Sequence, residues 1–316
     1  MYRKRLKNVY ELLEAGNNKK VIQEVDKLIA STNSNTQASS KKKQPLPSNQ
    51  EGLAGFDEKT TLIIAKALKS LALARTGRKV DSDPIIDELL NSNTTDENAL
   101  NIIMQYCKET QQLPKIVSFY ENAEKKCQQS APGTIEHEEI LSSLFNAYVR
   151  NRDFTKQQQI AMKLYKQTNK MIYAYWNAAS YVMMSKSGAN SATTGLYLQL
   201  AEKILQKAYD DKKMEYDGEF LLFLNILEQR NKYEDALKII NSLKESDLDK
   251  IGQINFKFER RIRYLKEIKK WSDLKLACED YFSEPKSSNL DDWPVYLVYF
   301  DCIDQLIHEN SSNKTA

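Results

Sequence analysis

Apolar residues recur at steps of three and four along almost the whole chain, which is the spacing of one face of an α-helix. In GLYLQLAEKILQKAYDDK, for example, one predicted apolar stripe consists of Leu196, Leu200, Ile204 and Ala208. Short segments rich in Gly, Pro, Asn, Ser and Asp interrupt the pattern, and these residue types favour turns and helix caps. No convincing alternation with a period of two predicts a strand. We therefore predict an all-α chain of about thirteen helices, most of them 12 to 20 residues long.

One short phrase recurs along this helical pattern: polar or charged residues, then a bulky residue, then an amphipathic run. The bulky residues are Leu113, Phe154, Tyr233 and Trp271, and their separations correspond to a unit of 38 to 41 residues. Repeats of this length are typical of helix pairs, which bury their apolar faces by stacking into a superhelical solenoid. We predict a tetratricopeptide-like (TPR-like) solenoid of antiparallel helix pairs, although the strict consensus is not met. The bulky residue should open the second helix of each pair and pack against the first.

One polar segment departs from the pattern. Residues 31–56 contain two prolines and a lysine triplet and too few apolar residues to offset the entropy of ordering, so we predict a disordered loop. The predicted organisation is therefore a first helix pair at 1–30, this loop, continuous TPR-like repeats over 57–309, and a disordered tail at 310–316.

Composition narrows the class of protein. The chain has 316 residues, 41% of them hydrophobic, and a net charge of only +3, which does not by itself diagnose nucleic-acid binding. It contains no signal-peptide core and no apolar run near the roughly 20 residues needed to cross a bilayer, which predicts a soluble cytoplasmic protein with no membrane partner. The four cysteines have no C-x-x-C spacing, which predicts neither a zinc site nor a disulfide framework.

Candidate catalytic residues are scarce. His137 and His308 lie far apart in polar contexts and have no metal-ligand spacing. Glu138 and Glu139 stand at a predicted helix start, where the helix dipole explains them better than acid–base chemistry. The sequence has no phosphate-binding or dinucleotide-binding glycine motif. The nearest match to an acetyl-CoA loop, NQEGLA, has Asn49 in place of the required Arg or Gln. We therefore predict a binding protein without catalytic residues, cofactor or metal of its own.

Several segments, in order along the chain, resemble one known family. They include RLKNVYELLEAGNNKKVIQEVDKLI at 5–29, AKALKSLALARTGR at 65–78 and, most specifically, DDWPVYLVYFD at 291–301. These are similar to the auxiliary subunit of the N-terminal acetyltransferase B (NatB) complex. Members of that family are considerably longer, so the resemblance implies the N-terminal part of such a subunit or a short member.

The resemblance implies a non-catalytic scaffold. Such subunits wrap a catalytic subunit of the GNAT fold, which binds acetyl-CoA, and place it at the ribosome, where it acetylates chains that begin Met-Asp, Met-Glu, Met-Asn or Met-Gln. The partner-binding residues are not evident from the sequence. The periodicity alone also fits the NatA auxiliary subunit, a proteasome-lid-like subunit or another TPR-like adaptor. A repeat protein that reads RNA would need recurrent polar residues at one repeat position, and none is evident.

Two basic clusters are candidate contacts for the ribosome near its exit tunnel. The segment 256–271 holds seven basic and two acidic residues, and its candidates are predicted to share one helix face. The candidates in the two clusters are Arg263, Lys266 and Lys270, and Arg3, Lys4, Arg5 and Lys7. They would bind ribosomal RNA phosphates. The alternative interpretation is a solvated helix face.

Overall fold

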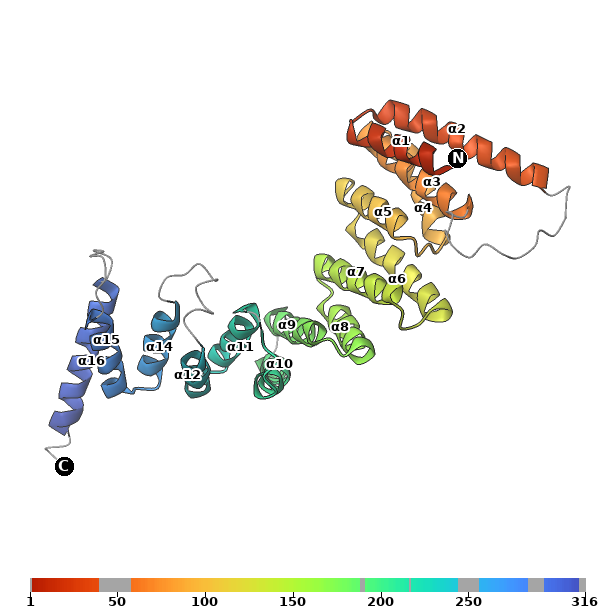
Figure 1. The fold of residues 1–316 in the computed structure, drawn as a ribbon. Helices are drawn as coiled ribbons and strands as arrows, with labels where there is room; N and C mark the ends of the chain where they lie inside the picture. Colours follow the sequence, from red (N-terminus) through yellow and green to blue (C-terminus); the bar gives the residue numbers. More distant parts are fainter. Residues whose placement is uncertain are drawn as a thin grey trace. The chain divides into compact units, whose positions relative to one another are not determined.

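The computed structural model describes residues 2–39, 58–187, 191–215, 217–243, 256–283 and 293–312. Within these ranges the chain forms fifteen α-helices and no β-strand (Figure 1). The all-α, helical-repeat prediction is therefore confirmed, but the predicted number of about thirteen helices was too low, because the described residues alone form fifteen. The helices are α1 (Tyr2–Glu14), α2 (Asn18–Ser39), α3 (Glu58–Arg75), α4 (Lys79–Asn91), α5 (Glu97–Glu109), α6 (Leu113–Ser130), α7 (Ile135–Asn151), α8 (Phe154–Thr168), α9 (Met171–Ser187), α10 (Ser191–Asp210), α11 (Asp217–Gln229), α12 (Tyr233–Ser242), α14 (Phe256–Glu267), α15 (Trp271–Ser283) and α16 (Trp293–Ser312).

The chain divides into two compact units, Met1–Tyr173 and Ala174–Ala316, and the boundary lies within α9. In the first unit α1 to α4 pack in chain order, as do α5 to α8, and α3 also packs against α1 and α5. In the second unit α10, α11, α12, α14, α15 and α16 pack in chain order. This side-by-side packing of consecutive helices is how helix pairs bury their apolar faces. The predicted continuity of the repeats over 57–309 stays a prediction.

The recurring phrase marks the joint within each helix pair, as predicted. Leu113 opens α6, Phe154 opens α8, Tyr233 opens α12 and Trp271 opens α15. The structure adds two joints of the same kind, before α2 and before α4. The sequence pattern therefore located these helix starts to the residue.

All six joints have the same backbone turn. Two residues before the second helix begins, one residue has a positive φ, and the residues concerned are Gly16, Gly77, Gln111, Arg152, Asn231 and Lys269. The next N–H then donates to a carbonyl five residues earlier, for example Gln112 to Cys107 at 2.8 Å and Lys270 to Leu265 at 3.0 Å. This is the hydrogen bond of the Schellman motif, which satisfies carbonyls at the end of the first helix.

The packing of the bulky residues differs in part from the prediction. Trp271 packs, as predicted, against a core cluster that includes Ile262 and Leu265 of α14, the first helix of its pair. The ring of Tyr233, however, lies 6.1 Å from the ring of Tyr264, which belongs to α14. This contact is possible because α12 packs against α14 as well as against α11. Such side chains therefore also join one pair to the next.

The apolar stripe predicted for α10 is not the face of the helix that is buried. Leu196 is 51% exposed and Leu200 and Ile204 are only half-buried, whereas Leu198, Ala201 and Leu205 are buried. The helix carries two overlapping apolar stripes, and the packing against α11 buries the second one. Ala208 belongs to both stripes and is buried, as predicted.

Two predicted disordered segments are partly helical. Helix α2 continues to Ser39, so residues 31–39 do not belong to a loop, and α16 continues to Ser312. Once a helix has formed, each added residue gains a backbone hydrogen bond, and residues 31–39 include no Gly or Pro that would stop it. The rest of the predicted loop, 40–56, and the rest of the tail, 313–316, lie outside the described residues.

Candidate functional site

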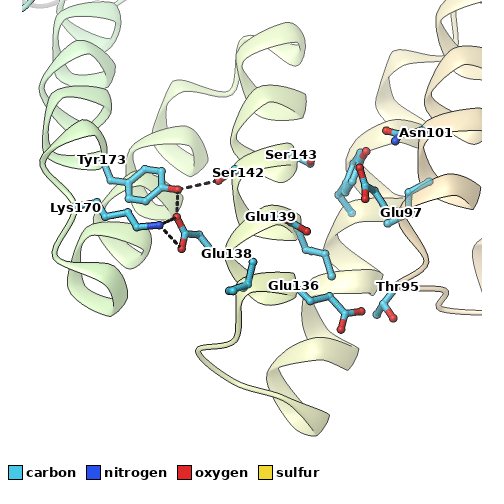
Figure 2. A pocket seen from close by; sticks show the side chains of 14 residues that line it. Thr95, Glu97, Asn101, Glu136, Glu138, Glu139, Ser142, Ser143, Lys170 and Tyr173 are labelled. Carbon is cyan, nitrogen blue, oxygen red and sulfur yellow. Dashed lines mark hydrogen bonds and ion pairs between the residues drawn. The ribbon is translucent and has the colours of Figure 1, made fainter. Parts of the chain in front are cut away.

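A groove of about 530 Å³ lies in the first unit, between the beginnings of α5, α7 and α9 (Figure 2). Its lining comes mainly from α5 and α7, together with Tyr120 of α6 and, on the far side, Lys170 and Tyr173. All of these residues belong to the same compact unit. The groove is therefore formed within one body.

Glu138 is the centre of a hydrogen-bond network at one side of this groove. Lys170 Nζ donates to both of its carboxylate oxygens, at 2.6 and 2.8 Å, and the Tyr173 hydroxyl donates to Oε1 at 2.5 Å. Ser142 Oγ lies 3.3 Å from the same hydroxyl (Figure 2). The bonds from Lys170 and Tyr173 outweigh burial and lower the pKa of Glu138 below its ordinary value. The network ties α7 to the segment that begins α9.

The other groove carboxylates are Glu97 of α5 and Glu136 and Glu139 of α7, and all three are exposed. Glu97 and Glu136 lie in the first turns of their helices, as does Glu138, where the helix dipole favours a negative charge. The N-cap of α7 is Thr134, whose side chain accepts from the His137 N–H at 3.3 Å. Local helix chemistry thus explains part of the groove's negative charge.

Several carboxylates elsewhere in this unit form an ion pair with a cation of a neighbouring helix. The ion pairs, with separations of 2.5 to 3.0 Å, are Lys66–Glu88, Lys69–Asp26, Arg75–Glu109, Lys115–Asp87 and Lys156–Glu121. By contrast, Glu97, Glu136 and Glu139 form no ion pair with any residue in the part of the chain that the structure describes. The groove therefore has a local excess of negative charge.

Apolar side chains line the same groove. Leu100, Ile140 and Tyr120 are buried and contribute to it, while Ile135, the first residue of α7, is 77% exposed. Burial is the main cause that raises the pKa of Tyr120. The hydrogen bond with Ser143 and the charge of Arg150 lower this pKa in part, and the charge of Glu97 raises it. The site combines an apolar surface with carboxylates, an arrangement suited to a cationic ligand that has an apolar part. Sequence reasoning missed it, because only Glu138 and Glu139 had been singled out.

The predicted basic face of 256–271 is only partly as expected. Arg263 Nη1 lies 3.6 Å from Glu228 Oε2, and Lys266 Nζ lies 2.6 Å from Asp301 Oδ2. Lys270 does not share a helix face with them, because α14 ends at Glu267 and the positive φ of Lys269 turns the chain before α15. The predicted common face was therefore wrong for Lys270. Whether these residues contact the ribosome stays a prediction.

The N-terminal cluster lies on α1. Lys7 Nζ lies 3.7 Å from Glu11 Oε1, one helical turn later. The side chains of Arg3, Lys4 and Arg5 are outside the described part of the chain. Their predicted role is therefore untested as well.

The histidines and cysteines do not converge on a reactive site in the described residues. His137 is fully buried in spite of its polar sequence context, and its Nδ1 accepts the Gly133 N–H at 3.1 Å. All four cysteines are buried, and burial raises the pKa of Cys107 to about 12 and that of Cys278 to about 11. Across the described residues, no group of three His, Cys, Asp or Glu side chains could hold a metal ion. None of the helices in this part is long and apolar enough to span a membrane.

Comparisons with known proteins agree with the fold. Residues 50–282 match the family model described as "Psidin, N-terminal TPR repeats region". A curated relative from Rattus norvegicus, "N-alpha-acetyltransferase 25, NatB auxiliary subunit", is 31% identical over 307 residues. That alignment covers 97% of this chain and 28% of the relative, so the chain spans little more than a quarter of the relative's length.

Two solved structures have a similar fold. "Structure of Naa15/Naa10 bound to HypK-THB" aligns with a TM-score of 0.56 at 13% identity, covering 96% of this chain and 39% of that one. "The NatB Acetyltransferase Complex Bound To CoA and MES" aligns with a TM-score of 0.51 at 18% identity, covering 78% of this chain and 31% of that one. The sequence resemblance to NatB auxiliary subunits is confirmed by the curated relative. Because the family model covers most of its length, the chain belongs to the family of Psidin N-terminal TPR repeat regions.

Proposed function

We propose that this chain is a non-catalytic scaffold of a NatB N-terminal acetyltransferase, which binds and activates a GNAT-fold catalytic subunit. The observation that carries the proposal is the similarity to a NatB auxiliary subunit over 97% of the chain. In this proposal the catalytic subunit binds acetyl-CoA and performs the transfer, and this chain contributes no cofactor or catalytic residue. The substrates are chains that begin Met-Asp, Met-Glu, Met-Asn or Met-Gln.

The fold supports a scaffold role on physical grounds. Stacked helix pairs present extended surfaces along the stack, and such surfaces suit a folded protein partner. Activation requires that the scaffold bind the active conformation of the catalytic subunit more tightly than its inactive conformations. A scaffold of this kind raises the population of the active conformation without touching the transferred acetyl group.

The test is reconstitution with a NatB catalytic subunit. Co-elution in gel filtration and faster acetylation of a Met-Asp peptide than by the catalytic subunit alone are the expected results. The chain alone should give no turnover, and turnover that persists after any copurified acetyltransferase is removed would refute the scaffold role. Affinity purification followed by mass spectrometry tests the alternative that the chain is a NatA auxiliary subunit. Recovery of a NatA catalytic subunit instead of a NatB catalytic subunit would assign the chain to the NatA complex.

The finer part of the proposal is placement at the ribosome in the cytoplasm. Basic residues near the turn between α14 and α15 would bind ribosomal RNA phosphates, and contacts of that kind weaken steeply as salt concentration rises. The exposed side chains of Lys269 and Lys270 support this proposal. Ion pairs with Glu228 and Asp301 already partly neutralise Arg263 and Lys266.

A further inference from the structure

We propose that the groove between α5, α7 and the start of α9 binds a lysine- or arginine-rich peptide segment of a partner protein. This inference does not rest on the proposed function. It rests on two properties of the groove: carboxylates without cations among the described residues, and an exposed aliphatic side chain in the same lining. Each property constrains the ligand differently.

The charge of the groove calls for a cationic ligand. Its lining contains four glutamates and one lysine, and that lysine, Lys170, binds Glu138. Glu97, Glu136 and Glu139 have no cationic partner among the described residues, although comparably exposed carboxylates such as Glu88 and Asp87 do. Bringing in positive charge would relieve the repulsion among the groove carboxylates.

The contact between Lys170 and Glu138 shows how such a ligand would bind. A primary ammonium group lies 2.6 and 2.8 Å from the two oxygens of a groove carboxylate, within the same lining (Figure 2). A lysine of a partner segment would make the same contact with Glu139 or Glu97. The chain thus provides, from its own sequence, one example of the contact proposed for the partner.

The apolar lining favours a peptide over a small polyvalent cation. Ile135 is 77% exposed at the rim, and Leu100 and Ile140 line the groove beside it. An aliphatic side chain flanking the basic residues would bury this surface, and removing apolar surface from water favours binding. A metal ion does not fit, because no metal-binding group of side chains is found among the described residues. The ligand therefore needs both a positive charge and an apolar side chain.

The experiment uses the full chain and a fluorescein-labelled peptide of lysine, leucine and alanine with blocked ends. Binding is measured by fluorescence anisotropy at low salt. The triple variant Glu97→Gln, Glu136→Gln, Glu139→Gln should weaken binding about tenfold, since each solvent-exposed ion pair contributes a modest amount. Ile135→Ser should weaken it several-fold without changing any charge. Circular dichroism checks that both variants retain helicity.

The matched control is Glu14→Gln, Glu234→Gln, Glu267→Gln, on α1, α12 and α14, which changes the net charge equally at exposed glutamates outside the groove. It should leave the affinity unchanged. The proposal is overturned if the peptide does not bind, if the control weakens binding as much as the groove variant, or if Ile135→Ser has no effect while spermine competes as well as the peptide. A peptide with glutamate in place of lysine should not bind.

Discussion

The hydroxyl of Tyr148 donates a hydrogen bond of 2.6 Å to Oε1 of Glu121, and Lys156 Nζ lies 3.0 Å from the same oxygen. These three residues come from α7, α6 and α8, so three consecutive helices meet at one carboxylate. Burial raises the pKa of Tyr148 above its ordinary value, and Glu121 raises it further, which keeps the phenol protonated as a donor. Other tyrosine hydroxyls also donate to a carboxylate of another helix, for example Tyr106 to Asp83 and Tyr299 to Glu279.

Tyr148→Phe should lower the free energy of unfolding by about 2 kcal/mol, because it removes a hydrogen bond to a charged group and leaves the ring packing in place. Urea denaturation followed by circular dichroism measures the change. Tyr165→Phe in α8 is the control, since that hydroxyl only reaches the weak acceptor Met171 Sδ at 4.0 Å. Equal effects of the two substitutions would show that the bond to Glu121 adds no specific stability.

Acid should weaken the contact between α7 and the start of α9. The pKa of Glu138 is lowered in the folded chain by hydrogen bonds from Lys170 and Tyr173, so its stabilisation is fully present above its unfolded value of about 4.5. It is lost as pH falls through the lower folded value. The stability difference between the native chain and Glu138→Gln should therefore shrink as pH is lowered from about 6 to about 3. Melting curves across this range test it, and a difference that stays constant or grows in acid would contradict it.

A single substitution at the positive-φ residue of a joint should change the stability of the chain. Arg152 has a φ of 56°, a conformation that costs an L-residue energy and a glycine almost none, so Arg152→Gly should stabilise the chain by about 1 kcal/mol. Gly77→Ala should destabilise it by a similar amount, because Gly77 has a φ of 79° and open space around its missing Cβ leaves only backbone strain. Gln159→Gly, at an exposed position within α8, is the control and should destabilise. The midpoints of denaturant unfolding measure these changes in stability. An Arg152→Gly variant less stable than the native chain would show that the Arg152 side chain contributes more to stability than the relief of backbone strain does.

The ribosome proposal is best tested outside the ion pairs. Lys269→Glu with Lys270→Glu should reduce cosedimentation with ribosomes at low salt severalfold while preserving helicity. A charge-reversing substitution at Lys266 would also break its 2.6 Å ion pair with Asp301. A loss of ribosome binding could then not be separated from a loss of stability. Lys125→Glu with Lys126→Glu on α6 changes the charge equally and should have no effect. If ribosome association survives the first pair of substitutions unchanged, the turn between α14 and α15 is not the anchor.

The residue pattern by itself was sufficient to predict the helical class, the repeat and the joints. Leu113, Phe154, Tyr233 and Trp271 each open the second helix of a pair, as their common spacing predicted. These features are readable because helix periodicity and turn geometry depend on residues close together in sequence. The sequence resemblance to NatB auxiliary subunits was likewise evident from segments alone.

Contacts between distant residues were decided by the tertiary structure. Only packing shows that α10 buries Leu198 and exposes Leu196, because both belong to plausible apolar stripes. Lys270 does not lie on the predicted basic face, because Lys269 has a positive φ and turns the chain. A lysine in the sequence does not predict this backbone conformation. The groove is the clearest case: Lys170 lies 32 residues from Glu138, and Glu97 lies on another helix pair. A site built from three helices depends on how those helices stack, and the apolar period of each helix sets only which side of it can face a neighbour.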